Sequence, residues 1–283
     1  PLFPNVPVDP PALIIRAMGR AEVLINGRPI PLREWKTRVS RDLLFCLLAY
    51  PEGLTKEQIG LHFWPDCSPD NLKTRFKNAI YRMRYALDQE VILFEDGIYR
   101  FDSSLDYEYD VELFLQSIAA GNAAADTAAK IEAYTIGLGY FGGPYMPDAE
   151  GGWILQLREQ LRQLYIDTAM NVAQLNFQTG ASDVALEWCQ RVLNEDPCLE
   201  DAHRLAMRIY AATGNRAGVA RQYSICQKAL QEEMPPYYRP EPGSEYERYL
   251  TARRRALGGP LPKRVVRPSQ NTPPPDAKAL DAF

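Results

Sequence analysis

The side chains best placed for specific chemistry lie in one short stretch, Ser68–Leu87. Its apolar residues recur at helical spacing and form a single stripe: Leu72, Phe76, Ala79, Ile80, Met83 and Leu87. The positions off that stripe carry cations, hydrogen-bonding groups and one aromatic ring: Lys73, Thr74, Lys77, Asn78, Tyr81 and Arg82. In the DNA major groove, lysine and arginine suit guanine and asparagine suits adenine. The pattern therefore predicts a DNA-reading helix, with a solvated basic face as the simpler alternative.

Cations also gather on the segments that flank this helix. Residues 36–41 lead into an expected helix, where backbone N–H groups and positive side chains together can bind a phosphate. We expect phosphate contacts from Lys36, Arg38, Arg41, Lys73, Tyr81, Tyr99 and Arg100. We expect base contacts from Thr74, Lys77, Asn78 and Arg82. Arg75 and Arg84 also fit pairing with acids on neighbouring helices.

The sequence offers little for catalysis or metal binding. Both histidines, His62 and His203, fall within helical patterns and fit surface or packing positions. No nucleophile-elbow, zinc-protease or phosphate-loop motif occurs. The glycine pairs at 142–143 and 151–152 fit turns rather than phosphate-binding loops. We therefore expect no enzyme activity, no cofactor and no metal site.

Charge and cysteine use restrict the class of protein. The chain has 283 residues and a formal net charge of −4, so nucleic-acid binding would depend on locally concentrated cations. Its five cysteines form no C-x-x-C pair, which suits a reducing compartment. No apolar run is long enough to span a bilayer, and no signal peptide opens the chain. We expect a cytoplasmic protein without membrane contact, and the initial proline indicates a piece of a longer protein.

The basic helix is expected to belong to a small unit of strands and helices. Ser68 can cap it, and Pro69 suits its first turn. The other expected elements are β-prone runs at 13–15 and 21–25 with an Asn26-Gly27 turn, helices at 40–49 and 55–63, and strands at 91–94 and 98–101 around Glu95-Asp96-Gly97. Thr55 and Gln58 form a capping box at the start of the second helix. The order is sheet, three helices and hairpin.

The second half of the chain reads as helical from about Val111 to Ala256, after a polar, acidic bridge at 102–110. Thr179-Gly180 and Thr213-Gly214 each end one helix and are separated by 34 residues, the tetratricopeptide period. The fold class we predict is mainly α with a small β component. Its parts are a linker at 1–12, a winged helix-turn-helix at 13–102, a tetratricopeptide-like helical domain at 103–256 and a Pro-rich disordered tail at 257–283.

These residues resemble a known pair of domains. Segments 40–49, 54–59, 63–66 and 78–87 resemble the helices and loop of an OmpR-type winged helix-turn-helix. Segments 109–114 and 153–161, with the repeats, are similar to the bacterial transcriptional activator domain of SARP-family regulators. The segment Trp35–Arg38 is bulkier and more basic than is usual in simple SARP proteins and looks closer to larger modular regulators.

The resemblance implies a DNA-binding transcriptional activator. Its third helix would enter the major groove, and its hairpin wing would touch the flanking minor groove. The loop before the third helix would meet RNA polymerase through Phe63, Trp64 and Asp66, although Trp64 fits a core position equally well. Double-stranded DNA and RNA polymerase are therefore the expected partners. A homodimer on repeated half-sites is also expected, because one recognition helix docks on each half-site.

A protein-interaction scaffold is the alternative. In that case the winged helix would serve packing only, and the repeat domain would hold a partner. An aromatic set in the helical half would line its groove or fill its core: Tyr134, Tyr140, Phe141, Tyr145, Trp153 and Tyr165.

Overall fold

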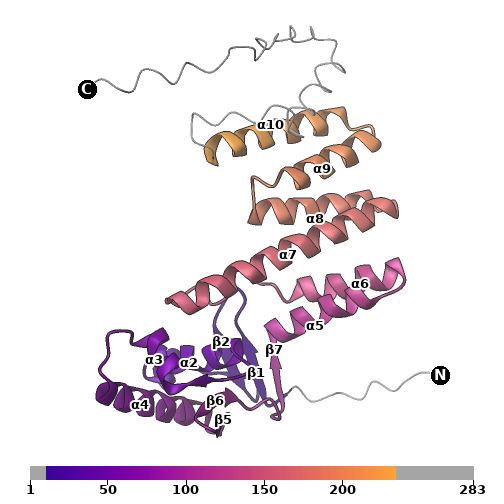
Figure 1. Ribbon diagram of the computed structural model, residues 1–283. Coiled ribbons are helices and arrows are strands. Elements are labelled where there is room, and N and C mark those ends of the chain that lie inside the picture. The colour runs from indigo at the N-terminus through magenta and orange to yellow at the C-terminus, as the bar shows by residue number, and fades with distance from the viewer. Residues whose placement is uncertain (1–10, 234–283) are drawn as a thin grey trace, which may run out of the picture. The chain divides into compact units, whose positions relative to one another are not determined.

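The computed structural model describes residues 11–233 (Figure 1). Three expectations lie wholly or mostly outside the described residues: the N-terminal linker, the helical region from 234 to 256, and the Pro-rich tail. Within 11–233 the predicted fold class is confirmed. Short strands and helices come first, and an all-helical part follows.

Two small sheets accompany the first helices. One has four strands in the order β3-β2-β1-β7, and the other has three in the order β4-β6-β5. The strands are β1 (Leu13–Arg16), β2 (Glu22–Ile25), β3 (Arg28–Pro29), β4 (Leu54–Thr55), β5 (Ile92–Glu95), β6 (Ile98–Phe101) and β7 (Tyr107–Tyr109).

Both predicted hairpin turns are confirmed. Asn26 and Gly27 have φ angles of 49° and 77°, and Asp96 and Gly97 have φ angles of 50° and 81°. A two-residue type I′ turn requires positive φ at both central residues, which asparagine, aspartate and glycine tolerate best. The turns join β2 to β3 and β5 to β6 as antiparallel pairs.

Four helices lie between these hairpins: α1 (Leu32–Trp35), α2 (Arg38–Ala49), α3 (Lys56–Phe63) and α4 (Pro69–Leu87). The predicted capping box on α3 is present, because Thr55 and Gln58 each bond the other's backbone N–H. Ser68 occupies the N-cap of α4, but its side chain makes no capping hydrogen bond, so that part of the expectation is wrong. The α4 helix ends at Asp88, which has left-handed geometry.

The remaining helices are α5 (Asp110–Ala123), α6 (Thr127–Gly139), α7 (Gly152–Gln178), α8 (Ser182–Glu195), α9 (Glu200–Ala212) and α10 (Arg216–Glu233). The predicted repeat appears as two equivalent turns, after α7 and after α9. In each, the threonine hydroxyl donates to the carbonyl four residues earlier, and the glycine has positive φ. This geometry ends one helix and lets the next fold back against it, as the ribbon shows for α7 with α8 and for α9 with α10 (Figure 1).

The segment 102–110 differs from the expected polar bridge. Its last part is β7, which pairs in parallel with β1. Asp110 is buried and accepts hydrogen bonds from the backbone N–H groups of Ala17 and Met18, the closest at 2.8 Å and 3.0 Å. The polar composition suggested a solvated linker, whereas the carboxylate satisfies buried backbone donors at the end of β1.

Burial raises the pKa of Asp110 to about 6, although the backbone N–H groups of Met18 and Ala17 oppose the shift. Because the pKa of Asp110 in the folded state lies above the ordinary value near 4, its contribution to the free energy of unfolding is fully present below about pH 4. That contribution is lost as the pH rises through about 6. We expect Asp110→Asn to remove this dependence and to lower the free energy of unfolding at pH 7 by about 1–3 kcal/mol, because the amide nitrogen would replace a carboxylate oxygen that accepts from the backbone N–H of Ala17 and would face that N–H donor to donor.

Urea unfolding between pH 4.5 and pH 7.5 measures this effect. Glu108→Gln, two residues away in β7, is the matched control and should keep the parental pH profile. Parallel profiles for the parent and Asp110→Asn would contradict the assignment.

Candidate nucleic-acid interface

The α4 helix has the two faces that its sequence predicted. Phe76, Ala79, Ile80, Met83 and Leu87 are buried. The exposed side carries Lys73, Thr74, Lys77, Asn78 and Tyr81, and Arg82 is half-buried at its edge. The structure therefore presents the expected base-contact residues together on one helix, within a winged helix arrangement.

An exposed aromatic pair extends this face. The rings of Tyr81 and Tyr85 stack with centroids 6.5 Å apart and are 67% and 66% exposed. Tyr85 lies one helical turn beyond Tyr81, so Thr74, Asn78, Tyr81 and Tyr85 follow one line along the helix. Sequence reasoning missed Tyr85, although its spacing from Tyr81 was the available signal.

A groove of about 510 Å³ separates α4 from the wing formed by β5 and β6. It is lined by Lys56, Lys73, Phe76, Lys77, Ile80, Tyr81, Arg84, Phe94 and Tyr99. The Tyr99 ring stacks on Phe94 at 4.4 Å and meets the edge of Phe76 at 4.7 Å. Tyr99 thus joins the wing to the buried side of α4. Lys56 and Phe94 were absent from the sequence-based set, because only the folded chain brings them to this groove.

The cations at the groove differ in how far acids already neutralise them. Arg84 pairs at 2.7 Å with Glu90, which lies just after α4 and not on a neighbouring helix as expected, and Lys56 pairs with Glu57 at 3.1 Å. Within residues 11–233, Lys73, Lys77 and Arg75 have no acidic side chain within ion-pair distance. Lys73 and Lys77 are therefore the groove cations most available to a phosphate or a base, and the expected partner of Arg75 is not found.

The wing is less basic than expected. Arg100 pairs with Glu95 at 2.9 Å, and Asp96 follows at the exposed turn. Phe94 is 60% exposed beside them. The wing therefore offers a ring and a partly neutralised guanidinium rather than a free cation.

Arg41 lies elsewhere. Its side chain is buried and pairs with Asp42 at 2.7 Å and with Asp148 at 2.8 Å. It joins α2 to the loop before α7, so it belongs to internal packing and not to the candidate interface. Arg38 is exposed, but it donates to the backbone carbonyl of Asp148 at 3.2 Å. Lys36 is exposed at the end of α1.

The loop expected to contact RNA polymerase packs partly against the rest of the protein. Phe63 and Trp64 are half-buried, and the Phe63 ring lies 6.0 Å from that of Trp153 at the start of α7. The backbone N–H of Trp64 also donates to the carbonyl of Gly60 at 2.7 Å. Asp66 is exposed. Asp66 is the most exposed residue of this set.

The aromatic set of the helical half fills the interior. Four of its members are buried and two are half-buried: Tyr134, Tyr145, Trp153 and Tyr165, then Tyr140 and Phe141. His203 is also buried, between the carbonyl of Pro197 and the side chain of Gln222. His62 is half-buried and stacks on Tyr50. Both histidines therefore have packing roles.

None of the helices in the described part of the chain is both long enough and apolar enough to cross a membrane. Across residues 11–233, no three His, Cys, Asp or Glu side chains are grouped so as to hold a metal ion.

Comparisons with known proteins agree with this architecture. Residues 109–245 match the family model of the bacterial transcriptional activator domain, and the last part of that match extends beyond the described residues. No curated protein matches the chain. A solved structure of EmbR from Mycobacterium tuberculosis, in complex with a low-affinity phosphopeptide, is similar with a TM-score of 0.68 and 16% sequence identity. The match covers 89% of this chain and 67% of that one. The chain therefore contains a bacterial transcriptional activator domain, and its fold is similar to that of EmbR.

Proposed function

We propose that this protein is a sequence-specific DNA-binding transcriptional activator, with α4 in the major groove. The observation that carries the proposal is the exposed face of α4. It combines the free cations Lys73 and Lys77 with the hydrogen-bonding side chains of Thr74 and Asn78. A solvated face would more commonly place acids beside such cations, but no acid occurs between Asp70 and Asp88.

The geometry supports a proposal of two layers of contact. Thr74, Lys77, Asn78 and Arg82 supply candidate contacts to base edges, which carry specificity. Lys73, Tyr81 and the groove beside the wing suit the sugar-phosphate strand between the major and minor grooves. Such contacts fix register and make binding depend on salt.

The partners and location extend this proposal. The exposed Asp66 loop is the candidate contact for RNA polymerase. Two protomers on repeated half-sites would supply the affinity that a single helix cannot. Because a transcriptional regulator must reach the DNA, we expect the protein in the cytoplasm. The spacing of the half-sites is a separate expectation, which the DNA selection described next would measure directly.

The deciding experiment is selection of bound DNA from a random pool, followed by sequencing. A shared motif in the selected DNA is the expected result, and repeated copies at one spacing would indicate a dimer. Recovery of unrelated sequences, with no salt-sensitive retention on a DNA resin, would instead favour the protein-interaction scaffold.

The ion pair on the wing gives an independent prediction. We expect Glu95→Gln to strengthen DNA binding by about two- to fivefold at low salt, because Arg100 then has no acid beside it and a nearby repulsive charge is removed. The salt dependence should become steeper by about one counterion, as for one added phosphate contact. Anisotropy titrations at several salt concentrations measure both quantities. Glu52→Gln, an exposed acid outside the wing, is the control, and equal responses of the two variants would remove Arg100 from the interface.

A further inference from the structure

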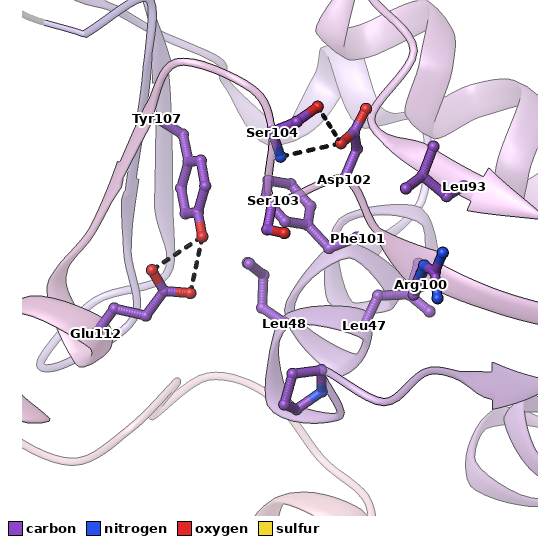
Figure 2. A pocket seen from close by; sticks show the side chains of 11 residues that line it. Leu47, Leu48, Leu93, Arg100, Phe101, Asp102, Ser103, Ser104, Tyr107 and Glu112 are labelled. Carbon is purple, nitrogen blue, oxygen red and sulfur yellow. Dashed lines mark hydrogen bonds between the residues drawn. The ribbon is translucent and has the colours of Figure 1, made fainter.

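A second cavity lies behind the wing, where the winged helix meets the helical part. Its volume is about 430 Å³, within the range of sites for small molecules. Its walls come from the end of α2, both wing strands, the loop after β6, β7 and the start of α5 (Figure 2). The lining residues are Leu47, Leu48, Pro51, Leu93, Arg100, Phe101, Asp102, Ser103, Ser104, Tyr107 and Glu112. Pockets between domains are common places for ligands.

One side of this cavity is apolar and the other is polar. Leu47, Leu48 and Phe101 are buried and supply the apolar side, together with Pro51. Figure 2 shows the hydroxyl of Tyr107 directed at the carboxylate of Glu112, across from Leu48. A ligand with a flat apolar body and one polar end fits such a division.

The polar end has a fixed acceptor. The Tyr107 hydroxyl donates to both Glu112 carboxylate oxygens, each at 2.9 Å. Burial, with help from Glu112, raises the pKa of Tyr107 to about 12, so the hydroxyl keeps its proton and remains a donor. The hydrogen bonds orient the carboxylate, while each oxygen retains a further lone pair for a ligand.

The charges around the cavity favour a cation. No Lys, Arg or His side chain of the described residues forms an ion pair with Glu112. Arg100 is already paired with Glu95. Asp102 accepts from the backbone N–H and the hydroxyl of Ser104, at 3.0 Å and 2.6 Å, and adds a second negative charge. An ammonium group is the partner that would neutralise Glu112.

We propose that this cavity binds a small organic amine with an aromatic or similarly flat apolar body. The ammonium group donates to the carboxylate of Glu112, and the apolar body packs against Leu48, Pro51 and Phe101. Ser103 and Ser104 at the rim can bond further polar substituents. Binding of the amine is independent of the function proposed above.

An effect on DNA would rest on that proposed function. Leu93, Arg100 and Phe101 line the cavity and belong to β5 and β6. The neighbouring Tyr99 lines the groove beside α4. The same two strands therefore form a wall of the amine cavity and a wall of the candidate DNA groove. An amine in the cavity would shift these strands and so change the shape of the groove.

The test uses 2-phenylethylamine as the probe and phenylacetate as its charge-reversed match. Titration of the full chain, followed by ligand-observed NMR, should give saturable millimolar binding of the amine and at least tenfold weaker binding of the acid. Glu112→Gln should weaken amine binding at least tenfold, and Tyr107→Phe should weaken it severalfold. Glu108→Gln, in the same strand as Tyr107, should leave it unchanged.

Equal binding of amine and acid, no saturable binding of the amine, or full binding by Glu112→Gln would each overturn the proposal. Tyr107→Phe keeps the test decisive should Glu112→Gln fail to fold. DNA affinity is then measured with and without the amine. A chain that binds amine but no DNA refutes the function proposed above and leaves the cavity assignment standing. Unchanged affinity for a bound DNA refutes only the link through the wing.

Discussion

Lys77→Ala is expected to weaken binding to a selected DNA site by about 5- to 150-fold while leaving the fold unchanged. Lys77 is exposed on α4 and has no acidic partner among the described residues, so its removal exposes no buried group. A good contact to a base edge contributes about 1–3 kcal/mol of discrimination, which corresponds to that range. Arg82→Ala is expected to act in the same direction.

Anisotropy titrations against the selected site and a scrambled duplex measure this effect. The ratio between the two affinities should fall, since a lost base contact removes specificity more than it removes general affinity. Lys130→Ala, a lysine substitution on α6 of the helical part, is the matched control. Unchanged specific affinity in both Lys77→Ala and Arg82→Ala would exclude α4 as the reading helix.

Arg41→Ala should have the largest effect on stability. It removes the only guanidinium in ion-pair contact with the buried carboxylate of Asp42 within the described residues, and it also frees Asp148. Breaking a buried ion pair costs about 3–5 kcal/mol, because one charge stays buried without its partner. We expect a loss near the lower figure, since the side chain of Asp148 is 42% exposed and can be hydrated.

The pH dependence of this loss identifies its cause. Burial already raises the pKa of Asp42, although Arg41 opposes the shift. Without Arg41 the folded pKa rises further, so the folded state gains relative stability below that pKa and loses it as the pH rises. Urea unfolding should therefore show a smaller defect at pH 5 than at pH 7.5. Arg20→Ala, at an exposed pair with Glu22, is the control and should cost less than about 1 kcal/mol. A pH-independent defect would point to lost packing instead.

The sequence predicted those features that short stretches determine. The apolar stripe of α4, the Thr55 capping box and the two Asx-Gly turns depend on residues within a few positions of one another, and each is confirmed. The tetratricopeptide-like turns were predicted for the same reason, since a repeated Thr-Gly at a fixed period reports a repeated local structure.

Features that depend on contacts between residues far apart in the sequence could not be predicted. The sequence predicts Arg41 as a phosphate contact, but in the structure it pairs with Asp148, which lies far along the chain. The groove beside α4 gains Lys56 and Phe94 from separate elements. Periodicity cannot reveal such partners, because it describes a segment and not what packs against it.

The parallel pairing of β7 with β1 determines where this chain can be divided. A fragment ending at Asp102, the expected boundary, would lack β7 and the Asp110 carboxylate. The edge of β1 would then be open, with Leu13 and Ile15 beside unpaired backbone groups, and such edges promote aggregation. The winged-helix part is thus completed by the first residues of its neighbour. An excised winged helix should include residues through α5 to remain soluble, and exchange of activator domains between regulators would have to carry β7 along.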